Sequence, residues 1–339
     1  MAEAHQSQIM LPTLQAVFFT SGLVAESQKE FFQDQQKTLY SKSKVMANRS
    51  WHIVGTGSIG SFCGANIIKR DSEVRFIARE PGKTWTFTEN NFHLSLGPAI
   101  SAMQSGPIDN LLLPTKAYDV LPALNILKPK LAPGANIVLC HNGMGTIDDV
   151  RKILSNDVNL YFCTTSNGAF RDNNSVVLAG TGQSFWQAIS IGDESRQLVN
   201  KDFEDLFRQS EPTTDLQELL WRKLLINCAI NPLTALERVE NGALADEQYR
   251  SVIQNIVAEV VAVANAHKVV LQFQTCVNIV LEVIQKTAKN TSSMRQDVIN
   301  NRRTEIDFIN GYVVKLAQQA GIPVPENQRL WHSIKALER

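Results

Sequence analysis

The sequence predicts an α/β domain built on a parallel sheet, followed by a domain made entirely of helices. From Trp51 to about residue 210, short apolar runs alternate with helical stretches, as in a parallel sheet that helices cover. Beyond residue 215 the apolar residues recur with helical periodicity, and strand-like runs almost vanish. A length of 339 residues suits two domains, each large enough to bury its own core.

The expected elements follow one another in a simple order. In the first domain they are a strand at 51–54, a helix through Ile68, strands at 74–78 and 111–113, a helix from Ala117, and strands at 136–140, 160–164 and 186–191. The Ser-Glu-Pro-Thr-Thr-Asp segment at 210–215 is typical of a linker. The second domain is expected to contain helices at 216–230, 243–267, 273–289 and 294–320. We therefore place the boundary between domains at residues 212 and 213.

Residues 1–48 form an N-terminal extension with no sustained helical or strand periodicity, and we expect it to be flexible. Met46 stands immediately before the first expected strand. One hypothesis is therefore that translation naturally starts at Met46, and an endogenous protein whose sequence begins earlier would rule this out.

Composition excludes several classes of partner. The 33 basic and 33 acidic residues give a formal net charge of +0, so no overall field attracts nucleic acid or an anionic membrane. The five cysteines are scattered and contain no Cys-x-x-Cys pair, which argues against a disulfide framework or a metal site. No apolar run approaches the roughly 20 residues that span a bilayer, and no signal peptide is evident. We expect a cytoplasmic protein with a small-molecule ligand.

A glycine-rich loop connects the first strand to the first helix, and its residues are Gly55, Thr56, Gly57, Ser58, Ile59 and Gly60. In such a loop the first glycine makes a tight turn, the second admits a pyrophosphate, and the third lets helix and strand pack closely. The pattern alone is also typical of structural turns. Here the strand before it and the helix after it favour a Rossmann-type dinucleotide-binding domain over residues 49–212.

Three further residues are expected to line the cofactor crevice. Arg79 ends the second strand, where an arginine accommodates the 2′-phosphate of NADP, although Glu80 beside it weakens the distinction and a solvated surface charge is the alternative. Lys116 and Asn142 follow the next two expected strands, at the edge of the sheet where ligands bind. Asn142 with Gly143 is also a common turn signature, so its position carries this prediction.

Polar residues interrupt an apolar helix in the second domain at a spacing of four. They are Lys223, Asn227 and Asn231, which the helical period places along one face. A desolvated lysine has a lowered pKa and becomes a candidate proton donor, while the asparagines can bind hydroxyl or carboxylate groups. The alternative is that Lys223 extends along the helix into solvent.

The last expected helix carries two charged residues on its apolar stripe, Arg302 and Glu305. Charges in this position are either paired structural ions or functional groups. Ser293 and Gln296 have the spacing of a capping box at the start of the helix, and a helix N-terminus also holds carboxylates.

Together these motifs resemble the ketopantoate reductase (2-dehydropantoate 2-reductase) family, from about Trp51 almost to the C-terminus. The most specific matches are Trp-Arg-Lys-Leu-Leu-Ile-Asn-Cys-Ala-Ile-Asn-Pro-Leu-Thr-Ala-Leu at 221–236, Asn241-Gly242, Ser-Ser-Met at 292–294 and Thr-Glu-Ile-Asp-Phe-Ile-Asn-Gly at 304–311. Two features depart from the family: Asn167 stands where a histidine is expected, and the N-terminal extension is unusual.

The resemblance implies NADPH-dependent reduction of ketopantoate to pantoate, for pantothenate and coenzyme A biosynthesis, with no metal. It implies that Lys223 is the general acid. The implied substrate-binding residues are Asn142, Lys223, Asn227, Asn231, Asn241 and Ser293. The implied cofactor-binding residues are the glycine loop, Arg79, Lys116, Asn142, Ala169 and Glu305, the last near the reaction centre.

Two other functions stay open at this stage. One is a related NADPH-dependent reductase of another 2-oxo acid, which the same carboxylate and carbonyl contacts would serve. The other is a non-catalytic NADP-binding sensor, which the presence of Lys223 and its asparagines argues against. The sequence also leaves a homodimer open.

Overall fold

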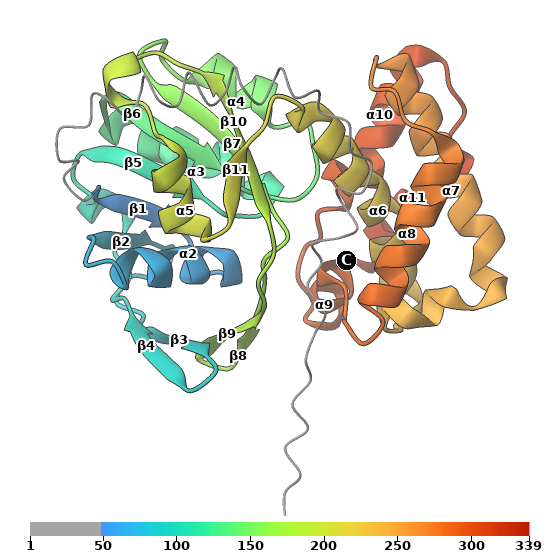
Figure 1. Ribbon diagram of the computed structural model, residues 1–339, viewed down its shortest axis with the longest axis horizontal. Coiled ribbons are helices and arrows are strands. Elements are labelled where there is room, and N and C mark those ends of the chain that lie inside the picture. The colour runs from blue at the N-terminus through green and yellow to red at the C-terminus, as the bar shows by residue number, and fades with distance from the viewer. Residues whose placement is uncertain (1–48, 339) are drawn as a thin grey trace, which may run out of the picture.

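The computed structural model describes residues 49–338, so the predictions for residues 1–48 lie outside the described part of the chain. Its first half contains two β-sheets with helices, and its second half is helical, with the two halves side by side (Figure 1). This agrees with the predicted fold class. Within residues 49–338, no helix combines the length and apolar character needed to cross a membrane.

The larger sheet has seven strands in the order β11-β10-β7-β6-β5-β1-β2. Their bounds are β1 Trp51–Val54, β2 Val74–Ile77, β5 Ile108–Leu113, β6 Leu131–Leu139, β7 Asn159–Thr165, β10 Ser184–Ser190 and β11 Ser210–Pro212. Strand β1 pairs in parallel with β2 and with β5, and β5, β6 and β7 continue the parallel arrangement. The carboxyl ends of these five strands therefore share one edge, and the strand order reverses beside β1, where open α/β sheets bind ligands.

Side chains alternate between the two faces of this sheet, and helices cover both faces. Leu112 and Val138 belong to a core that also contains Phe62 of α2 and Phe203 of α5, whereas Leu111 and Ile137 belong to the core on the other face. The core that contains Leu111 and Ile137 continues into the helical half. The helices are α2 Ser58–Ile68, α3 Ala117–Leu127, α4 Ile147–Ile153 and α5 Asn200–Phe207, with short 3₁₀ turns at Ala102–Gln104, Lys128–Lys130 and Glu194–Arg196.

A second sheet of four strands was not predicted. It has the order β4-β3-β9-β8, formed by β3 Trp85–Glu89, β4 Phe92–Leu96, β8 Gly168–Asp172 and β9 Ser175–Gly180. It extends beyond the β2 side of the larger sheet, and α2 packs against it (Figure 1). Strand β8 thereby comes close to the glycine loop that precedes α2.

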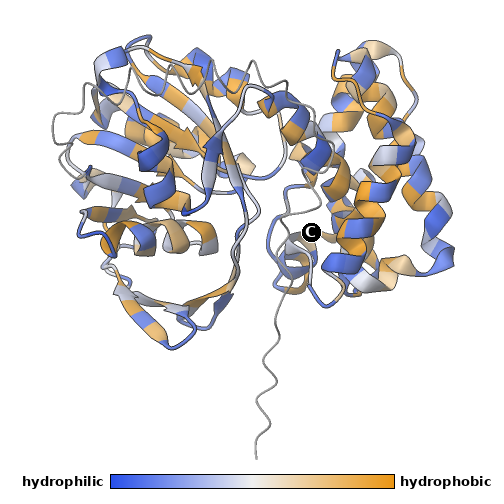
Figure 2. Cartoon of the chain, viewed as in Figure 1, coloured by the Kyte–Doolittle hydropathy of each residue, from blue (hydrophilic) through white to orange (hydrophobic). Residues whose placement is uncertain are grey.

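Six helices form the second half: α6 Leu216–Glu237, α7 Arg250–Ala266, α8 Phe273–Lys286, α9 Ser293–Ile299, α10 Asn310–Ala320 and α11 Pro325–Leu337. Helix α6 packs against α7, α8, α9 and α11. It continues through Pro232, which has no N–H to give the carbonyl of Cys228 four residues earlier. The side-chain amide of Asn310 donates to that carbonyl instead, at 3.1 Å, so the helix keeps its path. Apolar residues make up most of α2, whereas in the helical half apolar and polar residues alternate along the helices (Figure 2).

Several predicted boundaries are wrong. The first half of the expected linker, Ser210–Pro212, is strand β11 and pairs in parallel with β10. The expected helix at 243–267 begins as two 3₁₀ turns, Asn241–Ala245 and Glu247–Tyr249, before α7. The expected helix at 294–320 is divided into α9, a 3₁₀ turn at Ile306–Phe308, and α10.

That division changes how Arg302 and Glu305 are placed. Both precede the 3₁₀ turn in the connection after α9, so the helical stripe that grouped them in the sequence does not exist. The cap of α9 is also one residue earlier than expected. The hydroxyl of Ser292 accepts from the backbone N–H of Arg295 at 3.1 Å, and Ser293 is the first residue of the helix.

Candidate active site between the two halves

The glycine loop has the geometry that a bound phosphate requires. Gly55 has a φ of +87°, a left-handed turn that favours glycine, and its N–H donates to the carbonyl of Ile77 at 2.7 Å. A Cβ on Gly60 would lie 3.1 Å from Pro114 and 3.2 Å from Ile53, so helix and strand approach closely there. A Cβ on Gly57 would meet nothing within 4 Å. The N-terminus of α2 is therefore open to a ligand at Gly57.

A cavity of about 590 Å³ lies beside this loop, at the ends of β1 and β2. Its lining combines the backbone of Gly55 and Thr56 with apolar side chains that include Met103 and Ile126. Arg79 stands at its wall, with 84% of its side chain exposed, and forms an ion pair with Asp119. The volume and apolar lining suit an adenosine, and the guanidinium of Arg79 is a cation at the wall of the cavity.

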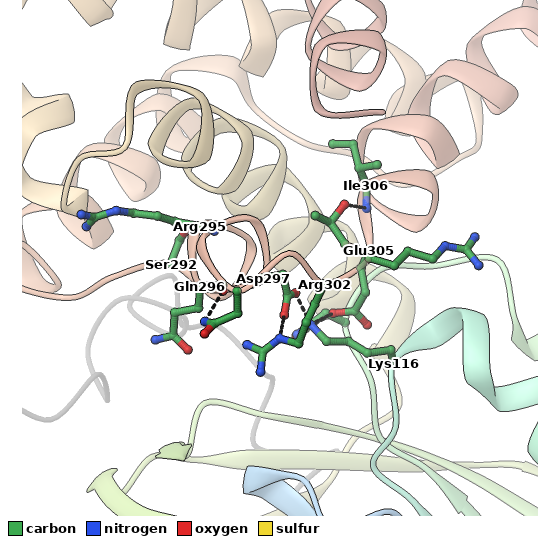
Figure 3. Close-up of polar contacts among 12 residues, drawn as sticks. Lys116, Ser292, Arg295, Gln296, Asp297, Arg302, Glu305 and Ile306 are labelled. Atoms are coloured by element: carbon green, nitrogen blue, oxygen red, sulfur yellow. Dashed lines mark hydrogen bonds and ion pairs between the residues drawn. The ribbon is translucent and has the colours of Figure 1, made fainter. Parts of the chain in front are cut away.

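Across the crevice, an ionic cluster joins the sheet to the helical half (Figure 3). The amino group of Lys116, between β5 and α3, lies 2.5 Å from the Oδ2 of Asp297 on α9 and 3.4 Å from the Oε2 of Glu305. Arg302 binds the other oxygen of Asp297 at 3.2 Å. Burial disfavours the charged form of Lys116, but the carboxylates of Glu305 and Asp297 outweigh burial and raise its pKa.

Glu305 is held from two sides. One carboxylate oxygen accepts from the backbone N–H of Ala117 at 3.0 Å, at the start of α3, and the other accepts from the side chain of Asn142 at 3.5 Å. Only 4% of the residue is exposed. The structure thus brings Lys116, Asn142 and Glu305 together, from three separate parts of the sequence.

Lys223 reaches the same edge of the sheet from α6. Its Nζ donates to the carbonyl of Thr165 at 3.0 Å and lies 3.3 Å from the hydroxyl of Thr164, both at the end of β7. Burial lowers the pKa of this lysine, although Cys140, Cys163 and Glu305 act in the opposite direction. The amino group is therefore anchored inside the crevice and does not extend along α6 into solvent.

The predicted asparagines lie on the helical side. Within residues 49–338, the side chains of Asn227 and Asn231 form no hydrogen bond to protein, and Asn231 is only 7% exposed. Asn241 donates to the hydroxyl of Thr287 at 2.9 Å, but its own Oδ1 is buried without a partner. A buried acceptor without a donor is costly, so this oxygen is suited to a hydroxyl group of a ligand.

Two predicted residues stand apart from these clusters. Ser293 is exposed at the first turn of α9, whereas its neighbour Ser292 is buried against the hydroxyl of Thr234 at 2.7 Å. Ala169 is half-buried on β8 in the small sheet. Asn167, the residue that departs from the family pattern, forms no hydrogen bond with Lys223. Its amide nitrogen lies 2.8 Å from the hydroxyl of Thr165, the residue whose carbonyl accepts from Lys223.

Sequence reasoning missed two charged residues of the crevice, Asp297 and Arg171. Asp297 follows Ser293 by four residues on α9, a spacing that places both on one helical face. Arg171 follows Ala169 by two residues on β8 and thus shares its face of the strand. Helical spacing from Ser293 could have indicated Asp297, and strand alternation from Ala169 could have indicated Arg171.

The crevice has the parts that a dinucleotide and a small acid need. It combines an open phosphate loop, a cavity of adenosine size, and half-buried cations and amides at the carboxyl edge of a parallel sheet. This fold and site define a dinucleotide-binding oxidoreductase with a helical second domain.

The chain belongs to the ketopantoate reductase family. Residues 51–191 match the family model described as ketopantoate reductase PanE/ApbA, and residues 215–338 match the model of its C-terminal part. The 2-dehydropantoate 2-reductase of Vibrio cholerae is 35% identical over 299 residues, which are 85% of this chain and 97% of that protein. The enzyme of Yersinia pestis is 32% identical over 84% of this chain and 94% of its own length.

Solved structures share the fold. A ketopantoate reductase of the PanE/ApbA family from Ralstonia eutropha aligns with a TM-score of 0.76 and 25% identity, over 86% of this chain and 98% of that chain. A ternary structure of D-mandelate dehydrogenase with NADH and anilino(oxo)acetate aligns with a TM-score of 0.78, at 22% identity and the same coverage.

Proposed function

We propose that the chain catalyses the NADPH-dependent reduction of 2-dehydropantoate to pantoate, with Lys223 as the proton donor. The observation that carries this proposal is the position of the Lys223 amino group, held half-buried at the carboxyl edge of the sheet in a chain of the ketopantoate reductase family. We further propose that residues 49–212 hold the cofactor and that residues 213–339 provide most of the substrate contacts.

Cofactor binding is assigned to the residues that line the glycine loop and its cavity. Gly57 leaves room for the pyrophosphate, and Arg79 would bind a 2′-phosphate in exchange for its contact with Asp119. Lys116, Asn142 and Glu305 stand further along the crevice and would surround the end of the cofactor that reacts, with Ala169 on the β8 side. NADPH, when bound, supplies the hydride.

The proton then comes from Lys223. Its ammonium group is fixed by Thr165 and Thr164, and its lowered pKa makes it a readier donor than an exposed lysine. As the carbonyl oxygen of the substrate gains negative charge, the ammonium stabilises that charge and transfers a proton to it. No water needs to enter the site for this step, because the donor is already in place.

The amide side chains orient the substrate. Asn227 and Asn231 follow Lys223 on α6 and have no hydrogen bond to protein within the described residues, so they are available to the carboxylate and hydroxyl groups. The free Oδ1 of Asn241 can accept the hydroxyl of 2-dehydropantoate, and Ser293 is exposed at the first turn of α9. An acid without that hydroxyl would leave the acceptor unpaired, which costs affinity.

We also propose a cytoplasmic location and a homodimeric assembly. All five cysteines are free thiols and all are buried, as suits a reducing compartment. The ketopantoate reductase of Staphylococcus aureus, described as dimeric, aligns with a TM-score of 0.73 at 18% identity. This likeness supports the proposed homodimer.

A substrate panel tests the proposal. Purified protein with NADPH should oxidise the cofactor with 2-dehydropantoate at a much higher kcat/KM than with 2-oxo acids that lack the hydroxyl, such as 2-oxoisovalerate or phenylglyoxylate. If the protein reduced one of these acids but did not reduce 2-dehydropantoate, that acid would replace 2-dehydropantoate as the proposed substrate. NADPH binding without turnover of any 2-oxo acid would point to a sensor.

A further inference from the structure

Arg171 connects the small sheet to the glycine loop. It lies on β8, and its Nη2 contacts the carbonyl oxygen of Thr56, the residue between Gly55 and Gly57. The small sheet thus places a guanidinium beside the loop that opens toward a phosphate.

The electrostatic surroundings of Arg171 are unusual for an arginine of this chain. Most arginines within residues 49–338 form an ion pair with a carboxylate, but Arg171 forms none there. Burial lowers its pKa, and the positive charge of Arg302 lowers it further. A partly desolvated cation that faces another cation is destabilised unless an anion lies nearby.

Arg302 belongs to the opposite wall of the crevice. It follows α9 in the helical half and binds Asp297, which also binds Lys116 of the sheet half (Figure 3). More than half of its side chain is exposed, at 54%, so its guanidinium has N–H donors that the contact with Asp297 does not use. The positive charges of Arg171 and Arg302 interact although the two residues come from different halves of the molecule.

We propose that Arg171 is a cofactor-binding residue and that, with Arg302 opposite, it binds the pyrophosphate of the dinucleotide over the glycine loop. The carbonyl of Thr56 uses one of the five N–H donors of Arg171, and the others can reach phosphate oxygens in the forked geometry that arginine favours. This inference rests on the proposed function only in requiring that the loop binds a dinucleotide.

The competing role is purely structural, in which Arg171 does no more than hold the carbonyl of Thr56. Two substitutions separate the roles. Arg171→Lys keeps the positive charge, whereas Arg171→Gln keeps amide donors but removes the charge. Arg329→Gln is the matched control, because Arg329 is on α11 in the helical half and pairs with Glu326.

The experiment measures the Kd of each purified variant for NADP⁺ and for 2′-AMP, which carries the ribose phosphate but no pyrophosphate. Arg171→Gln should weaken NADP⁺ binding roughly 10- to 100-fold, the range of one or two charged hydrogen bonds. Arg171→Lys should weaken it less, and both variants should bind 2′-AMP like the wild type. The dependence of NADP⁺ affinity on salt should also be shallower in Arg171→Gln.

Unchanged NADP⁺ affinity in Arg171→Gln would overturn the inference, and so would an equal loss of NADP⁺ and 2′-AMP binding, which would indicate a disturbed loop. Failure of the wild type to bind NADP⁺ would refute the proposed function itself, so the two failures are distinguishable.

Discussion

Replacing Lys223 by alanine removes the proposed proton donor while leaving the glycine loop untouched. Within residues 49–338, the amino group forms hydrogen bonds only with Thr165 and Thr164 at the end of β7, at 3.0 and 3.3 Å. A positioned general acid contributes about 10²- to 10⁴-fold to the rate. We therefore expect kcat to fall by that factor, which corresponds to about 3–5 kcal/mol of barrier, with the Kd for NADPH nearly unchanged.

The same change has a structural cost that must be separated from catalysis. Truncation leaves the carbonyl of Thr165 without its donor, and a lost hydrogen bond of this kind costs about 1 kcal/mol of stability. Lys223→Arg is the matched control, because arginine keeps the positive charge but does not release its proton at accessible pH. If the proton matters as well as the charge, the arginine variant should remain well below wild type in kcat.

The pH dependence of kcat tests whether Lys223 acts as a proton donor. A proton donor works in its protonated form, so activity should fall as pH rises through the pKa of Lys223. Burial lowers that pKa, so the fall should occur below the usual lysine value of about 10.4. The assay is the loss of NADPH absorbance at saturating 2-dehydropantoate from pH 6 to 10. Wild-type kcat in Lys223→Ala, or the same alkaline limb in Lys223→Arg, would refute the reasoning.

Two further predictions address stability and the cofactor loop. Arg208 and Lys69 hold the pKa of Glu89 at about 2, so Glu89→Gln should cost roughly 2 kcal/mol of unfolding free energy above about pH 4.5, a difference that disappears as pH falls through 2. Denaturant titrations at several pH values measure this, and a difference independent of pH would contradict it. Gly57→Ala should keep the wild-type Tm, since its Cβ meets nothing within 4 Å, yet weaken NADP⁺ binding at least about 10-fold. Gly180→Ala, equally open on β9, should change neither, and unchanged affinity in Gly57→Ala would show that the loop does not hold the pyrophosphate.

The features that sequence could predict were local and periodic. The glycine loop needs only its own φ angles and its neighbours on one strand and one helix, so its pattern appears within a few residues. The stripe of Lys223, Asn227 and Asn231 depends on a single continuous helix, and α6 is one. The alternation of strands and helices likewise predicted the parallel sheet, whose buried strands read as apolar runs.

The features that sequence missed depend on distant contacts. Glu305 is held by the backbone of Ala117 and by Asn142, neither of which is near it in sequence, so helical periodicity assigned it to a stripe that the fold does not form. The four-stranded sheet unites two hairpins separated by about 70 residues, through the parallel pairing of β3 with β9. Such pairing leaves little trace in either segment alone, because half-exposed strands are short and mixed in polarity.

Pro232 shows why helix ends are hard to predict. A proline normally marks the end of a helix, and the helix expected at 216–230 stops before Pro232. Helix α6 continues to Glu237 because Asn310, more than 70 residues away, satisfies the carbonyl that the proline leaves free. This hydrogen bond is a tertiary contact, so it cannot be predicted from the residues around Pro232 alone.

The reduction of 2-dehydropantoate with NADPH is the activity that we propose for this chain. Its most direct test is the initial rate of cofactor oxidation by the purified full chain with 2-dehydropantoate, measured with NADPH and then with NADH. We predict turnover with a kcat/KM for NADPH at least about 10-fold above that for NADH, because Arg79 stands where a 2′-phosphate would bind. No oxidation of either cofactor in the presence of 2-dehydropantoate would contradict the assignment.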